Sequence, residues 1–243
     1  MVSVFLKSLK LYVETIDLIT YSSIFILLSM ILLPLVASYV NVGGALVRFS
    51  SFYMDITLLQ FLVILFTSAV GMLLLSFFTA AVISIVKLKQ TLDHFGFSRV
   101  MKSFKEYVFK VFWFFVIISI VSILIGVFFD FLGFDWVAQV FILLLWVLFL
   151  FTPQAIVIEN FGLREAMLDS VNFLKRNFIH AVCYLVTGLV MLLVLAFLET
   201  ALGQVFVWEH KVVSIVIMAL FILPFLLIYG TELYLKRYPV SSF

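Results

Sequence analysis

Six long apolar stretches, separated by shorter polar segments, dominate the chain. A membrane-spanning helix needs about 20 predominantly apolar residues, and each of the six stretches meets that length. The pattern predicts an all-α polytopic membrane protein, in which the whole chain forms one transmembrane domain of six helices, residues 1–243. The expected spans are residues 19–40, 56–86, 109–129, 137–158, 179–198 and 212–235.

Three further segments, residues 2–16, 97–108 and 162–178, carry apolar side chains on one helical face only. In each of them the apolar positions recur with the i, i+3, i+4, i+7 spacing of an amphipathic helix, and charged side chains occupy the remaining faces. Such helices are too charged to span a bilayer and are expected to lie in its interface. Each precedes an odd-numbered span. The predicted architecture is therefore three transmembrane hairpins, each preceded by a cytoplasmic amphipathic helix.

Short sequence similarities accompany this arrangement and indicate an internal repeat. They comprise Ser8-Leu9-Lys10, Ser103-Phe104-Lys105 and Ser170-Val171-Asn172, each just before an odd-numbered span. Such a pattern can arise from common ancestry of the three units, or independently from the physical requirements that all interfacial helices and hairpins share. The three units enter the membrane from the same side, so the repeat is parallel and not inverted.

The sequence predicts particular features for two of the spans, the second and the fourth. The second, residues 56–86, is longer than the hydrocarbon layer requires, so it should tilt or project beyond the bilayer. Small residues four positions apart, Thr67 and Gly71 and then Ser76, Ala80 and Ser84, allow close helix approach and favour a place near the centre of the bundle. Pro153 should bend or break the fourth span near its inner end.

The basic residues are strongly segregated. Thirteen of the fifteen Lys and Arg residues fall before the first span, between spans two and three or four and five, or after the sixth. The exceptions are Arg48 and Lys211. Because basic loops are retained in the cytoplasm during insertion, we expect a multi-pass protein of the cell membrane with both termini cytoplasmic. No small-residue cleavage site follows the first apolar stretch, so the N terminus should be retained.

Composition supports a lipid environment: 66% of the residues are hydrophobic and 12% are charged. A surface of this kind is a poor partner for nucleic acid. The single cysteine, Cys183, lies within the fifth span, where it is either a small packing residue or a site of lipidation or redox chemistry.

Few residues suggest chemistry. The sequence contains no metal-binding His-Glu-x-x-His pair, no nucleophile elbow and no glycine-rich phosphate loop, so we expect no catalytic residues, no metal and no cofactor. Glu159, Glu199 and Glu232 lie near the ends of predicted spans, where carboxylates commonly cap helices or extend to the interface. The alternative is an inner polar pocket formed by Glu159, Arg164, His180 and Glu232.

The basic segments are stronger evidence for a function, because clusters of Lys and Arg beside a span attract anionic lipid headgroups. The alternative is that these segments serve only to fix the topology. The candidate contacts for lipid or for a protein partner on the cytoplasmic face are Lys87, Lys89, Arg99, Lys102, Lys105, Lys110, Lys175 and Arg176.

One stretch resembles a known family. The sequence Pro153-Gln154-Ala155-Ile156-Val157-Ile158-Glu159-Asn160, followed by Glu165-Ala166, Asp169-Ser170 and Leu174-Lys175-Arg176-Asn177-Phe178, resembles a hairpin and basic helix of certain six-helix membrane families. These include the membrane domain that is fused to some glycerophosphodiester phosphodiesterases. The resemblance covers residues 153–178 closely and the rest in outline. It implies architecture only, because the chemistry of those enzymes resides in a soluble barrel that this chain lacks.

Three functions remain open. The first is a non-enzymatic integral membrane protein that binds membrane lipids, anionic ones included, or a protein partner. The second is a transporter, such as the permease subunit of an exporter, whose loop at 87–108 would contact a separate ATPase. A lipid-modifying enzyme ranks last, because the sequence offers no paired acid, base and nucleophile.

Overall fold

The computed structural model describes residues 2–37, 58–91, 97–203, 209–236 and 238, and every regular element within them is helical. This confirms the all-α fold class. The predicted outer loop, with Arg48, lies outside the described residues, as do the side chains of Arg99 and Lys102. The elements are α1 (Val2–Glu14), α2 (Ile16–Ala37), α4 (Leu58–Thr91), α5 (Phe97–Phe131), α6 (Asp135–Leu148), α7 (Thr152–Ile158), α8 (Leu163–Arg176), α9 (Phe178–Gly203), α10 (Glu209–Ile217), the π-helical turn η1 (Met218–Ile222) and α11 (Leu223–Leu235).

Five helical segments are long and apolar enough to cross a membrane, and they correspond to predicted spans two to six. A sixth candidate is α1 together with α2, which meet at Thr15 with a bend of 86°. The lengths and compositions of these helices are those of a multi-pass integral membrane protein.

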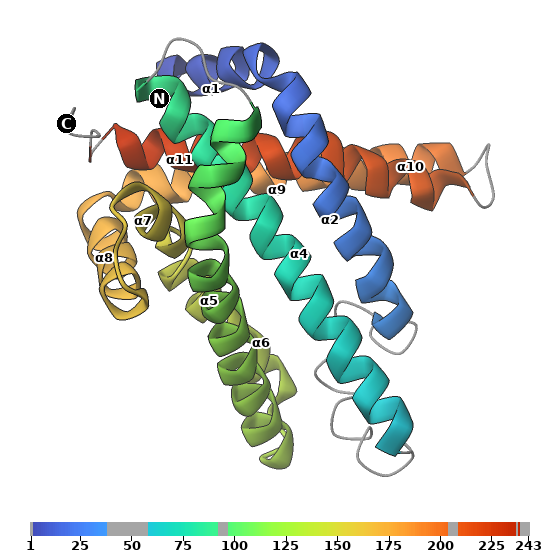
Figure 1. Cartoon of the computed structure of the whole chain (residues 1–243). Coiled ribbons are helices and arrows are strands. Elements are labelled where there is room, and N and C mark those ends of the chain that lie inside the picture. Colours follow the sequence, from blue (N-terminus) through green and yellow to red (C-terminus); the bar gives the residue numbers. More distant parts are fainter. Residues whose placement is uncertain (1, 38–57, 92–96, 204–208, 237, 239–243) are drawn as a thin grey trace.

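The helices extend from one common end of the molecule (Figure 1). Helices α2, α4, α5 and α6 run side by side away from that end, each packed against the next. Helix α9 and the continuous rod formed by α10, η1 and α11 make an antiparallel pair that crosses the other four. Helix α1 lies across the common end, close to α11.

Helix α4 lies at the centre of the bundle, as its small residues predict. It packs against α2, α5, α7 and α11, and 61% of its most apolar window is buried, compared with 6% for α9. The Ser29 hydroxyl of α2 donates to the carbonyl oxygen of Gly71 at 2.9 Å. A backbone contact of this kind requires a close approach, which the absence of a side chain at Gly71 permits.

The second predicted amphipathic helix is not a separate element. Residues 97–108 form the first turns of α5, which continues without a break to Phe131. The sequence explains this difference, because no glycine or proline interrupts residues 97–125 and helical hydrogen bonding can propagate through the whole stretch.

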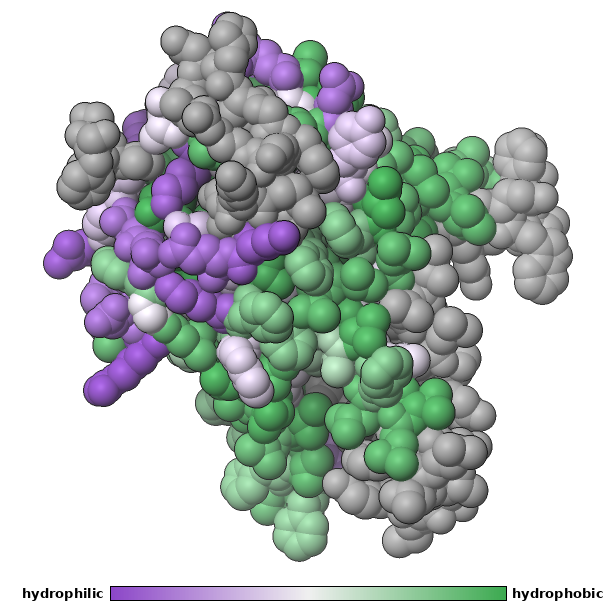
Figure 2. Space-filling model, viewed as in Figure 1, coloured by the Kyte–Doolittle hydropathy of each residue, from purple (hydrophilic) through white to green (hydrophobic). Residues whose placement is uncertain are grey.

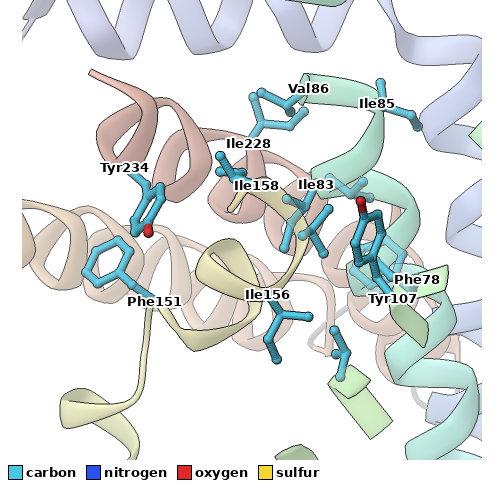
Figure 3. Close-up of a cluster of buried hydrophobic side chains, with 14 of the residues drawn as sticks. Phe78, Ile83, Ile85, Val86, Tyr107, Phe151, Ile156, Ile158, Ile228 and Tyr234 are labelled. Atoms are coloured by element: carbon cyan, nitrogen blue, oxygen red, sulfur yellow. The ribbon is translucent and has the colours of Figure 1, made fainter. Parts of the chain in front are cut away.

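The fourth span is broken, as Pro153 predicts. Helix α6 ends at Leu148 and the short helix α7 begins at Thr152, with Pro153 in its first turn, where a missing N–H costs nothing. All seven residues of α7 are buried. Figure 3 shows Ile156 and Ile158 of α7 among the side chains of Ile83 and Ile228 from α4 and α11, so this half-helix forms part of the core.

Candidate functional site

Charged side chains gather at the common end of the bundle, which we call the polar end. Figure 2 shows hydrophilic residues concentrated there, whereas the shafts of the helices are apolar. The polar end comprises α1, the last turns of α4, the first turns of α5, helices α7 and α8, and the last turns of α11.

Helix α1 carries three distinct stripes along its length. One is buried against the bundle, the second is apolar but exposed, and the third is charged. We call the second the outer apolar stripe; its leucines and valine are 44–62% exposed. The stripes consist, in that order, of Val4, Ser8 and Leu11; of Leu6, Leu9 and Val13; and of Lys7, Lys10 and Glu14.

A proline in the sixth span explains how α1 is anchored. Pro224 has no N–H and its ring displaces the carbonyl group four residues earlier, that of Leu220, from regular helical bonding. The chain forms the π-helical turn η1 at this point. The Tyr12 hydroxyl donates to the carbonyl oxygen of Leu220 at 2.7 Å, so α1 supplies a donor to a carbonyl group whose usual helical donor Pro224 cannot provide. The Phe5 ring adds an edge contact to Phe225, with centroids 5.3 Å apart.

The charged stripe of α1 faces the last turns of α4 and α11. The Lys7 ammonium lies 2.7 Å from a carboxylate oxygen of Glu232, whose side chain is only 3% exposed. The amide of Gln90 donates to the other carboxylate oxygen at 2.9 Å. A buried carboxylate is tolerated when it is paired and hydrogen-bonded in this way, so Glu232 links α1, α4 and α11.

A second carboxylate, Glu14, lies nearer the surface. Lys89 of α4 is 3.3 Å from it and Lys10 is 3.8 Å from it, which is beyond hydrogen-bonding distance. The Lys10 side chain is 79% exposed. Lys10 is therefore the least engaged of the three lysines on this side of the molecule.

Between these groups is an open pocket of about 480 Å³, which we call the α1 pocket. Its lining contains three lysines, two glutamates, one amide and one leucine, so ammonium groups outnumber carboxylates by one. The lining residues are Lys7, Lys10, Leu11, Glu14, Lys89, Gln90 and Glu232.

Two of the lysines expected to contact lipid have internal roles. Lys87 donates to the carbonyl oxygens of Val157 (2.7 Å) and Ile158 (3.0 Å), at the C-terminus of α7. Terminal carbonyl groups of a helix lack partners within it and attract a cation. Lys110 donates to the side-chain oxygen of Asn160 at 2.8 Å, and Asn160 has a left-handed backbone with φ of 55°. Lys87 and Lys110 therefore fix the turn that follows α7.

The other predicted contacts differ in position. Lys89 lines the α1 pocket, whereas Lys105, Lys175 and Arg176 are exposed at the surface of the polar end. A surface location leaves these three side chains accessible to a membrane or a partner.

The N-terminal side of α7 is held by Ser170 of α8. Its hydroxyl donates to the carbonyl oxygen of Leu148 (3.0 Å) and accepts from the backbone N–H of Phe151 (3.1 Å), so it bridges the break between α6 and α7. Ser8, which aligns with Ser170 in the proposed repeat, instead donates to the Val4 carbonyl oxygen of its own helix at 2.9 Å. The two serines thus have different structural roles.

Aromatic rings hold α8 against the bundle. Phe173 is fully buried, with its ring centroid 4.5 Å from that of Phe151 and 5.2 Å from that of Tyr234. The Tyr234 hydroxyl donates to the Asp169 carboxylate at 2.7 Å.

The grouping of Glu159, Arg164, His180 and Glu232 in one inner pocket stays a prediction. Glu232 lines the α1 pocket, whose described lining does not include Glu159, Arg164 or His180. Glu159 ends α7, Arg164 is exposed in the first turn of α8, and His180 is half-buried in the first turn of α9. Lys7, Lys10 and Glu14 of the α1 pocket were recognisable from the sequence as one face of a helix, but their proximity to Lys89 of α4 and Glu232 of α11 depends on the 86° bend.

Partial burial and the neighbouring carboxylate of Asp169 raise the pKa of the Glu159 carboxyl above its usual value, while the Lys87 ammonium acts in the opposite direction. An acid whose pKa is raised on folding binds its proton more tightly in the folded state, so its ionisation costs stability. This cost is absent below the ordinary pKa of glutamic acid and is complete above the raised folded-state pKa.

We therefore expect Glu159→Gln to raise the midpoint of thermal unfolding in detergent at about pH 7.5, and this advantage should shrink as the pH falls to about 4, near the ordinary pKa of glutamic acid. Unfolding curves of both proteins across this pH range measure the difference. A wild-type protein that is the more stable of the two at the higher pH would show that Glu159 is stabilised in its charged form.

Within the described part of the chain, no group of three or more His, Cys, Asp or Glu side chains is arranged to hold a metal ion. Comparison of the chain with protein-family models, curated proteins and solved structures finds no match. The resemblance of residues 153–178 to the six-helix membrane families therefore stays a prediction.

Proposed function

We propose that this chain is an integral membrane protein that carries out no covalent chemistry and binds anionic membrane lipids through its polar end, at the cytoplasmic surface of the cell membrane. The observation that carries this proposal is the three-stripe helix α1. It turns by 86° from α2 and presents an exposed apolar stripe beside a charged one. This combination suits a helix that lies in the interface with its apolar side chains among acyl chains.

The distribution of charge supports the same proposal. Exposed basic side chains of the polar end, Lys105, Lys175 and Arg176 among them, are positioned to attract anionic headgroups in addition to fixing topology. The apolar shafts (Figure 2), and above all the exposed α9, offer a surface suited to hydrocarbon. In this interpretation, the three amphipathic segments are the means by which the polar end meets the membrane surface.

Purification of the full chain in a mild detergent, followed by identification of everything that remains bound, tests the proposal. We expect a lone chain that retains anionic phospholipid. Recovery of an ATPase with the wild-type chain, and its loss from an Arg99→Glu, Lys102→Glu, Lys105→Glu variant, would replace this proposal with that of an exporter permease.

A further inference from the structure

We propose that the α1 pocket is a specific site for the phosphate group of an anionic phospholipid headgroup. This inference rests on the proposed function, but it concerns residues that general attraction to a basic surface does not single out. The site lies between α1, α4 and α11, and its lining belongs to three elements that are far apart in sequence.

The distribution of charge within the pocket favours an anion at its mouth. Glu232 lies deep in the protein and is neutralised by Lys7 at 2.7 Å. At the mouth, Lys10 and Lys89 share the single carboxylate of Glu14. One positive charge is thus left over, and the monoanionic phosphodiester of a headgroup such as phosphatidylglycerol matches it.

Geometry distinguishes a lipid from a soluble phosphate as the source of this group. The outer apolar stripe of α1, Leu6, Leu9 and Val13, runs along the same helix as the pocket lysines and is exposed. A headgroup in the pocket would allow its acyl chains to lie along this stripe. A free phosphate would leave the stripe without a partner.

The pocket is also built and not merely a gathering of surface lysines. Tyr12 fixes α1 to the Leu220 carbonyl group at 2.7 Å, and Gln90 and Lys7 hold Glu232 in place. Lys10 and Lys89 are therefore presented from a rigid frame, which reduces the entropy cost of binding a headgroup.

The test is native mass spectrometry of the full chain in detergent, with added phosphatidylglycerol, phosphatidylcholine or inorganic phosphate. The key variant is Lys10→Gln, Lys89→Gln, which spares the ion pair of the buried Glu232. The matched control is Lys105→Gln, Lys175→Gln, which makes the same charge change at exposed positions outside the pocket.

We expect phosphatidylglycerol to bind wild type in preference to phosphatidylcholine. Each of the two pocket lysines should contribute about fivefold to the affinity for the headgroup, so the first bound phosphatidylglycerol should dissociate about 30-fold more readily from the pocket variant. The two control lysines attract headgroups diffusely and hold none in place, so the control should lose clearly less affinity than the pocket variant. Glu14→Gln, which releases both lysines from their shared carboxylate, should strengthen binding.

If the pocket variant and the control lost bound phosphatidylglycerol equally readily, the pocket proposal would be overturned. The lipid would then be attracted diffusely to the polar end, and the proposed function would remain intact. Binding of inorganic phosphate without phosphatidylglycerol would refute a lipid source. Absence of any preference for anionic lipid in wild type would refute the pocket and the proposed function together.

Discussion

Replacing Phe173 with alanine is expected to lower the free energy of unfolding by about 3–5 kcal/mol, because a fully buried aromatic ring leaves a cavity that its neighbours fill only in part. The ring lies between Phe151 at 4.5 Å and Tyr234 at 5.2 Å. Its loss separates α8 from both α7 and α11, so the polar end should loosen before the rest of the bundle.

Phe178→Ala is the matched control. It also removes a phenylalanine ring, five residues further along the chain, but from a position that is 65% exposed. Thermal unfolding of both variants in the same detergent measures the difference. Equal shifts in the two midpoints would mean that α8 is not held by the aromatic contacts described above.

Replacing Lys87 with methionine should cost about 1.5–3 kcal/mol, the range typical of hydrogen bonds to a charged group. Methionine preserves the length of the side chain but leaves the carbonyl groups of Val157 and Ile158 without the donor seen in the structure. Both of these residues are buried, so water replaces the ammonium poorly.

Lys89→Met provides the comparison two residues along the same helix. Its ion pair with Glu14 is partly exposed and 3.3 Å long, and such pairs contribute about 0–1 kcal/mol. The predicted order of stability is therefore wild type, then Lys89→Met closely behind, then Lys87→Met. If Lys89→Met were the less stable variant, the internal role of Lys87 at the end of α7 would be refuted.

The fold was predictable from sequence to the extent that it depends on local pattern. Apolar length located spans two to six, small residues placed α4 at the centre, and Pro153 located the break in the fourth span. The continuity of α5 was missed, because a change from amphipathic to wholly apolar character resembles a boundary even where nothing interrupts the helix.

The candidate site was less predictable, because it depends on contacts between distant residues. A lysine beside a span looks the same in sequence whether it faces headgroups, as we propose for Lys10, or caps a buried helix, as Lys87 does. A local signal of one tertiary contact was Pro224, which deprives the carbonyl group of Leu220 of its usual helical donor. Nothing in the sequence identifies Tyr12 as its partner.

The proposed function requires the polar end and the far ends of the helices to lie on opposite sides of the cell membrane, with the polar end in the cytoplasm. Single cysteines introduced into a Cys183→Ser background test it most directly, with a membrane-impermeant thiol reagent applied to intact and to permeabilised cells. Asn172→Cys marks the exposed surface of α8, and Leu132→Cys marks the turn between α5 and α6. We predict that Leu132→Cys reacts in intact cells and that Asn172→Cys reacts only after permeabilisation; labelling of Asn172→Cys in intact cells, or of both positions from one side, would contradict the account.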